Sequence, residues 1–331
     1  IQALEKDDSG VDYFLSNYFK AKFTDTRAEN AEFDKEYHKT IFDAKWNEKI
    51  QLKLNPEKVK EFLKNNFRYY IKLYIKIIEE IKREEKAPSP YLYFNSLNEQ
   101  ERQVLLIFSA CEVDDPAEDE KILLISKLLD RHFTLLNLNG CYDSNEFTEE
   151  LIKINTKIRN QPSEIIKSVF DEQLISYICQ KRGTVVSSPF IFSYFNEAGY
   201  HLPIRFLRYF FARIEHFISQ GINVSCESYR NLVKNTGTVN GYHIEHILAN
   251  NDENLSLFDN EEEDFEKERN KLGGLLLLKG RDNQSSGKEV YKDKLKTYVG
   301  TNLWNQTLLS DFYKSNKDME AFSKKYSLSF K

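Results

Sequence analysis

Two short stretches decide how the last third of this chain folds. Residues 242–248 read Tyr-His-Ile-Glu-His-Ile-Leu, and residues 272–278 read Leu-Gly-Gly-Leu-Leu-Leu-Leu. Each contains a short apolar run beside polar or glycine-containing segments, as is typical of a β-strand. The polar segment 279–287 then predicts a turn, and the Lys-rich run 288–298 predicts a helix. The predicted order is therefore strand, loop, strand, turn, helix.

The sequence before residue 232 predicts helices. Asn55-Pro56-Glu57 combines a polar cap, a proline and an acid, which favours a helix start. Apolar residues then recur every three or four positions up to Ile81, and residues 87–90, with two prolines, should end this helix. Similar runs cover 145–158, 162–181 and 203–220. We expect a mainly α protein with a helical domain over 1–232 and a smaller module over 233–331.

Composition excludes several classes of protein. The 331 residues are 40% hydrophobic and 30% charged, as in a folded, water-soluble protein. The net charge of −5 argues against a uniformly basic nucleic-acid binder but leaves room for local basic patches. No apolar run approaches the roughly 18 residues that a membrane span needs, so we expect no membrane partner. Four cysteines without a CxxC pair indicate a reducing cytoplasm. Because the chain starts at Ile1 and its one Met is Met319, we expect the C-terminal piece of a longer protein.

Three residues suggest hydrolytic chemistry. Glu245 directly precedes His246, and Asn283 follows His246 by 37 positions. Carboxylate and amide oxygens suit Mg²⁺ or Mn²⁺, and a neutral histidine can take a proton from water near neutral pH. Nearby cations complete a set that fits hydrolysis of a phosphodiester. In an extended strand the two neighbours would point to opposite faces, so a bend is needed if both serve one site.

At these residues the sequence resembles the HNH (ββα-metal) nuclease family. It looks most like the C-terminal HNH domain of Gmr-type modification-dependent restriction enzymes and the related Ssp-type phage-defence proteins. The resemblance rests on residues 243–248 and 272–278, on Asn283 and the serines after it, and on the Lys-rich run that ends at Tyr298; it covers roughly 240–300. It implies a small ββα-metal module after the helical domain.

The resemblance also implies roles for single residues. Glu245 would bind one divalent cation, Mg²⁺ or Mn²⁺, and His246 would activate the attacking water. Asn283 would complete the catalytic set as the second metal ligand. His243 stays open between a supporting role, a phosphate contact and an exposed strand residue. The cations expected to approach DNA phosphates are Lys279, Arg281, Lys288 and Lys292.

Two positions depart from the family pattern. Ala249 stands where the family usually has proline, which should only loosen the turn. Gly274 stands where the middle asparagine usually lies, nine residues before Asn283. Glycine has no amide to tie the loop between the strands, and a lost hydrogen bond typically costs about 1 kcal/mol. We therefore expect a loop that is tied differently, and loss of activity remains an open alternative.

The implied function is a metal-dependent DNA endonuclease, nicking or cleaving, of a bacterial system that restricts phage or modified DNA. The family also implies an N-terminal nucleotide-hydrolysing sensor domain with an Asp-Gly-Gln-Gln-Arg motif. This sequence contains neither that motif nor a P-loop, so the sensor would belong to a missing N-terminal part. The alternative, which Gly274 favours, is a catalytically degenerate HNH scaffold that acts as a DNA-binding or protein-interaction module.

Overall fold

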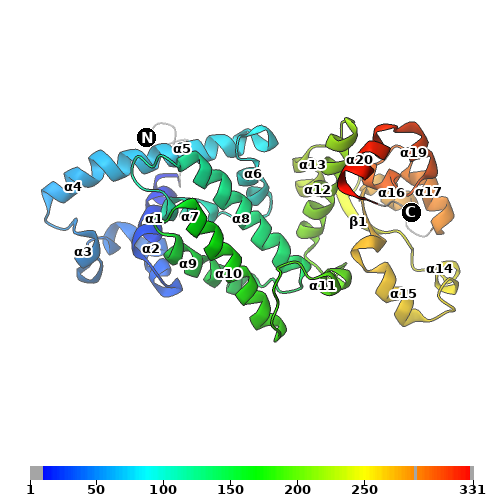
Figure 1. Ribbon diagram of the computed structural model, residues 1–331, viewed down its shortest axis with the longest axis horizontal. Coiled ribbons are helices and arrows are strands. Elements are labelled where there is room, and N and C mark those ends of the chain that lie inside the picture. The colour runs from blue at the N-terminus through cyan, green and yellow to red at the C-terminus, as the bar shows by residue number, and fades with distance from the viewer. Residues whose placement is uncertain (1–9, 287–288, 329–331) are drawn as a thin grey trace. The chain divides into compact units, whose positions relative to one another are not determined.

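The computed structural model describes residues 10–286 and 289–328, and it consists mainly of helices (Figure 1). This confirms the mainly α class that the sequence predicts. The chain divides into two compact units, Ile1–Ile191 and Phe192–Lys331. Within the described ranges, none of the helices combines the length and the hydrophobicity needed to cross a membrane.

The first unit is a set of helices packed around aromatic side chains. Its long helix starts where the sequence predicts, because the Asn55 side chain accepts a hydrogen bond from the Lys58 amide at 3.2 Å. It continues through one π-helical turn to Lys82, and its buried stripe includes Tyr70 and Tyr74. Pro90 begins another helix. The helical segments are α1 (Gly10–Phe23), α2 (Arg27–Thr40), α3 (Ala44–Ile50), α4 (Pro56–Phe62), η1 (Leu63–Phe67), α5 (Arg68–Lys82), η2 (Glu84–Lys86), α6 (Pro90–Leu97), α7 (Gln103–Ala110), α8 (Glu118–Leu138), α9 (Ser144–Ile158) and α10 (Ser163–Arg182).

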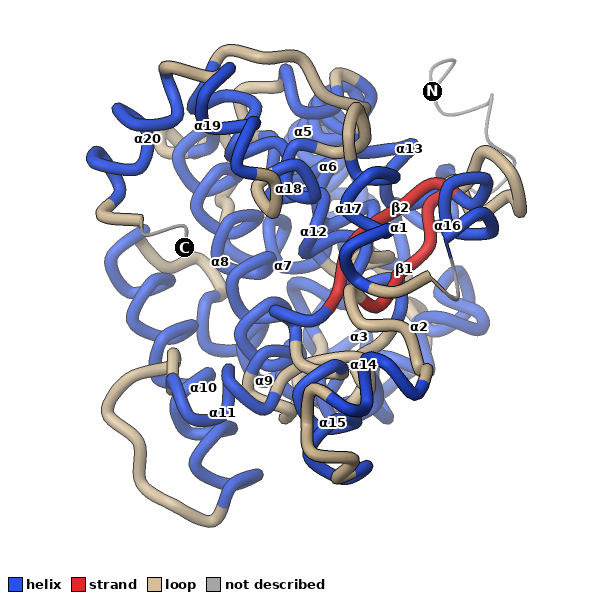
Figure 2. Tube along the Cα trace, turned by 90° about the vertical axis from the view of Figure 1, so that its right-hand side faces the viewer, coloured by secondary structure: helices blue, strands red, loops and turns tan. Residues whose placement is uncertain are grey.

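In its described residues, the second unit contains a β-hairpin, the long helix α12 (Ile204–Ile222) and several shorter helices. Strands β1 (Tyr242–His246) and β2 (Leu275–Lys279) are antiparallel, with Tyr242 opposite Lys279 and His246 opposite Leu275 (Figure 2). The helical segments are α11 (Phe192–Glu197), α12 (Ile204–Ile222), α13 (Tyr229–Lys234), α14 (Asp252–Ser256), α15 (Glu262–Arg269), η3 (Leu272–Gly274), α16 (Gly280–Ser286), α17 (Tyr291–Tyr298), α18 (Leu303–Gln306), α19 (Ser310–Ser315) and α20 (Asp318–Tyr326).

The segment after β2 differs from the sequence prediction. Most of the predicted turn 279–287 is the helix α16, and the next helix, α17, starts at Tyr291. Helix α16 can follow β2 directly because carbonyls of the loop before β1 accept hydrogen bonds from its first amides. The Gly280 and Arg281 amides donate to the carbonyls of Gly241 and Val239, at 2.8 and 3.0 Å. The order strand, strand, helix is therefore present.

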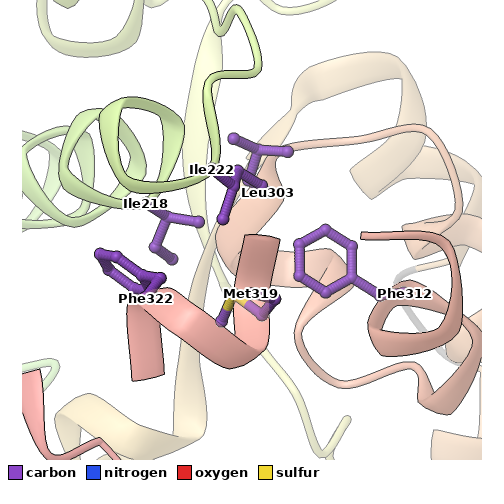
Figure 3. Close-up of a cluster of buried hydrophobic side chains, with 6 residues drawn as sticks. All are labelled: Ile218, Ile222, Leu303, Phe312, Met319 and Phe322. Carbon is purple, nitrogen blue, oxygen red and sulfur yellow. The ribbon is translucent and has the colours of Figure 1, made fainter. Parts of the chain in front are cut away.

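The long helix α12 forms the base of the second unit. Ile218 and Ile222 pack against side chains of the C-terminal helices, namely Leu303, Phe312, Met319 and Phe322 (Figure 3). A Cβ at Gly221 would lie 2.0 Å from the Phe322 ring, so only glycine allows this approach. The same helix also contacts both strands, whereas Leu276 and Leu278 on the other face of β2 pack with Tyr298 of α17. The hairpin is thus held between α12 and α17.

Candidate active site

His246 lies at the end of β1 between two partners from distant parts of the sequence. Its Nε2 is 2.8 Å from the side-chain oxygen of Asn270, the residue after α15. Its ring lies 4.6 Å from the Tyr200 ring, centroid to centroid. Burial lowers the pKa of His246 below its usual 6.5, and the hydrogen bond to Asn270 only partly opposes this. The imidazole is therefore fixed and favoured in its neutral form.

Backbone pairing brings Tyr200 and Asn270 together. The Tyr200 amide donates to the Asn270 carbonyl at 2.8 Å, and the Leu272 amide donates to the Ala198 carbonyl at 3.0 Å. Between them, Gly199 forms an isolated bridge with Lys271. A Cβ at Gly199 would lie 1.9 Å from the Asn270 carbonyl oxygen, so glycine is required here. The segment before α12 thus supplies one wall of the histidine site.

Glu245 points to the other face of β1 and is paired with a buried cation. Its Oε1 accepts a hydrogen bond from Lys294 Nζ at 2.5 Å, and the same ammonium donates to the His246 carbonyl at 2.8 Å. The Lys294 side chain is 0% exposed and that of Glu245 is 14% exposed. Sequence reasoning expected a bend that would bring Glu245 and His246 to one face. In the structure both belong to the regular strand β1, and their side chains have separate partners.

Asn283 lies on α16, which packs against both strands. Within residues 10–286 and 289–328, no hydrogen bond or ion pair joins Asn283 to Glu245 or His246. The same ranges contain no group of three or more His, Cys, Asp or Glu that could hold a metal. The oxygens around Lys294 Nζ, a carboxylate and a carbonyl, are nevertheless the hard donors that Mg²⁺ or Mn²⁺ prefers. The donor chemistry beside Glu245 therefore fits a cation, and an ammonium is the cation found there.

Gly274 occupies the position of the middle asparagine of the HNH pattern, and the nearby backbone of Arg269 leaves no room for a side chain there. A Cβ at Gly274 would lie 2.4 Å from the Arg269 carbonyl oxygen. The loop is tied instead by main-chain groups: the Gly274 carbonyl accepts from the Ile247 amide at 2.8 Å. Arg269 Nε adds a bond to the Leu248 carbonyl at 3.2 Å. The expectation of a differently tied loop agrees with this geometry.

The four cations predicted to meet DNA have different positions. Lys279 lies opposite Tyr242, so it is at the far end of the hairpin from His246, roughly 13 Å away at about 3.3 Å per residue. It approaches Glu227 at 4.0 Å, and Arg281 approaches Asp282 at 3.4 Å. Lys292 is exposed on α17. Lys288 lies outside the described residues.

His243 shares its strand face with Glu245, two residues away. Its Nε2 is 3.3 Å from the Gly237 carbonyl, in the loop that leads into β1. A Cβ at Gly280 would come within 3.3 Å of the same nitrogen. These contacts place His243 near the joint between the hairpin and α16, where it helps to hold the loop before the strand.

Two cavities lie on opposite ends of the hairpin. The one beside the histidine site has a volume of about 770 Å³ and is lined in part by Tyr200, Glu266 and Asn270. The other, of about 480 Å³, contains both Lys279 and Arg281 together with carboxylates, Glu215, Glu227 and Asp282. Two of the predicted DNA-contacting cations therefore lie in a mixed-charge cavity away from His246.

Sequence reasoning missed three residues of this site: Tyr200, Asn270 and Lys294. Tyr200 and Asn270 carry no local signal, because their pairing depends on contacts across 70 positions of sequence. Lys294 did have a local signal. It stands in the predicted Lys-rich helix, four positions before Tyr298, so the two side chains share one face of that helix. Tyr298 is buried, so the helical repeat places Lys294 on the buried face.

Comparison with known proteins finds one family model that covers this site. Residues 187–319 match the model of the C-terminal domain of GmrSD restriction endonucleases. The matched range contains the hairpin, α16 and α17, and it confirms the similarity to Gmr-type restriction proteins inferred from the sequence. No curated protein and no solved structure matches the chain. This similarity supports a restriction endonuclease role.

Proposed function

We propose, from the similarity of residues 187–319 to the C-terminal domain of GmrSD restriction endonucleases, that the segment 233–331 is an HNH-type DNA endonuclease. The order β1, β2, α16 supports a ββα-metal module. The observation that carries the proposal is His246: a half-buried imidazole, fixed by Asn270, adjacent in sequence to a partly buried carboxylate, with its pKa below the usual value. Such a group can accept a proton from water at neutral pH.

In the proposed reaction, neutral His246 takes a proton from a water molecule whose oxygen attacks the phosphorus. The new P–O bond forms as the opposite P–O bond to the sugar breaks, and the leaving oxygen takes a proton from solvent. Glu245 and Asn283 would hold one Mg²⁺ or Mn²⁺, which would offset negative charge on the phosphate. Because Lys294 already bonds to Glu245, the metal and the ammonium would share that carboxylate.

The biological setting is proposed from the family. The module would nick or cleave foreign DNA, modified phage DNA included, in the bacterial cytoplasm. A nucleotide-hydrolysing sensor domain would precede the chain in the complete protein. Lys292, on the same helix as Lys294, is a better candidate than Lys279 for contacts near the cleaved bond, because Lys279 lies at the far end of the hairpin from His246. Lys288 stays a candidate from the sequence alone.

A degenerate HNH scaffold that binds DNA or protein is the second candidate. Two observations favour it: Gly274 replaces the middle asparagine, and Lys294 neutralises the carboxylate that would bind metal. A plasmid assay with Mn²⁺ or Mg²⁺ separates the two candidates. We expect the wild type to nick or cleave, and His246→Ala to lower the rate roughly 100- to 10,000-fold.

The matched control is His38→Ala, which removes an exposed histidine on α2 of the first unit. It should cleave like the wild type. Equal cleavage by His246→Ala would contradict the role of His246. Salt-dependent DNA binding by a wild type that cleaves nothing would instead favour the scaffold.

A further inference from the structure

The side-chain amide of Asn270 has only one orientation that satisfies its neighbours. One end of this amide lies 2.7 Å from the Glu266 carbonyl and 3.0 Å from Glu266 Oε2. Both of these groups accept hydrogen bonds, so the amide nitrogen must face them. The amide oxygen therefore faces His246, and the orientation is fixed by chemistry.

This orientation determines which nitrogen of His246 carries the proton. Asn270 Oδ1 can only accept, so Nε2 of His246, 2.8 Å away, must be the donor. In the neutral ring the proton is then on Nε2, and Nδ1 is left with its lone pair. Nδ1 is thus the nitrogen that can take a proton from water.

The support around Asn270 is extensive. Glu266 is itself bound at both oxygens by Arg269 Nη1, at 3.1 Å each. The backbone of Asn270 is paired with Tyr200, whose ring contacts His246. The His246 ring is therefore held by the Asn270 amide at Nε2 and by the Tyr200 ring. These two partners lie on two segments whose backbones are hydrogen-bonded to each other.

Gly274 explains why the support comes from Asn270. The backbone of Arg269 occupies the space that a side chain at 274 would need, and Asn270 directly follows Arg269. We propose that Asn270 is the positioning residue of His246: it holds the imidazole through Nε2–H and leaves Nδ1 to accept the proton of the attacking water. The catalytic part of this proposal rests on the proposed nuclease function, whereas the tautomer is a property of the folded protein alone.

The test combines NMR with kinetics on the full chain. With ¹⁵N-labelled histidine, we expect His246 to show a protonated Nε2 and an unprotonated Nδ1 in the wild type. Asn270→Leu should give a mixture of tautomers and lower kcat for plasmid cleavage roughly 10- to 100-fold with little change in KM, as is usual for residues that orient a reacting group. Asn270→Asp, which keeps the acceptor, should retain the wild-type tautomer.

The control is Asn250→Leu, because Asn250 also bonds to Glu266, at 3.4 Å, while His246 is held by Asn270. It should leave both readouts unchanged. Wild-type signals and wild-type kcat in Asn270→Leu would overturn the proposal. If Asn270→Leu does not fold, a neutral His246 with its proton on Nδ1 instead of Nε2 in Asn270→Asp would overturn it. A wild type that cleaves nothing but shows the expected tautomer, lost in Asn270→Leu, would leave the positioning in place and remove only the nuclease function.

Discussion

Glu245 and His246 are neighbours in sequence, yet the two faces of β1 hold them by different means. Glu245 is partly buried and is bound by a charged partner, the fully buried Lys294. His246 is half-buried and bound by a neutral one, Asn270. A carboxylate in place of the Asn270 amide would raise the pKa of the histidine. The amide fixes the imidazole without adding a charge next to it, whereas Glu245 forms an ion pair with the ammonium of Lys294.

The largest expected effect comes from removing the charged partner. Lys294→Met should lower the free energy of unfolding by about 3 kcal/mol, because it leaves the partly buried Glu245 carboxylate without its cation. Urea unfolding without divalent metal measures this. The double variant Glu245→Gln/Lys294→Met should recover most of the loss.

Mn²⁺ sharpens this test of the Glu245 face. If Glu245 binds metal, Mn²⁺ should stabilise Lys294→Met more than the wild type, because the metal no longer shares the carboxylate with an ammonium. Equal stabilisation of the two proteins would argue against Glu245 as a ligand. His246→Ala should unfold like the wild type within about 1 kcal/mol, since it leaves this ion pair intact.

The next largest expected effect concerns Gly274, in the loop between β1 and β2. Gly274→Ala should destabilise the protein by about 2 kcal/mol, because its Cβ would lie 2.4 Å from the Arg269 carbonyl. Gly273→Ala is the matched control, since no atom lies within 4 Å of its Cβ. Thermal unfolding compares them. A stable Gly274→Asn that cleaves faster than the wild type would show that the glycine is a defect rather than a fitted position.

The sequence predicted the parts of the fold that depend on local patterns. The cap at Asn55 and the apolar repeats placed the long helix and the helices near 145–158 and 162–181, because such signals act within a turn or two. The helix α16 was read as a turn because its residues are polar. It forms because the loop before β1 supplies carbonyls for its first amides, which local sequence does not encode.

The candidate site also contains residues that a local sequence motif predicted and residues that it could not predict. Glu245, His246 and Asn283 were predicted from a motif, and the structure places them on β1 and on the helix packed against it. Their roles stay predictions. Tyr200 and Asn270 could not be found, since the pairing that brings them to His246 depends on the fold of segments far apart in the chain.

The smallest effect concerns the pH dependence of the His246 face. Because burial lowers the pKa of His246, the imidazole of the folded protein takes up its second proton only below the usual 6.5. Cleavage should therefore stay constant as pH falls through 6.5 and decline only at lower pH. The unfolded chain binds that proton at higher pH, so the contribution of His246 to stability is present above 6.5 and is lost as pH falls toward the lowered pKa. Asn270→Asp replaces the neutral partner by a charged one and should move the acid limb of kcat upward by about one pH unit. An acid limb that stays in place would mean that the neutral amide does not set the protonation of His246, and the contrast between the two faces of β1 would then lie in geometry alone.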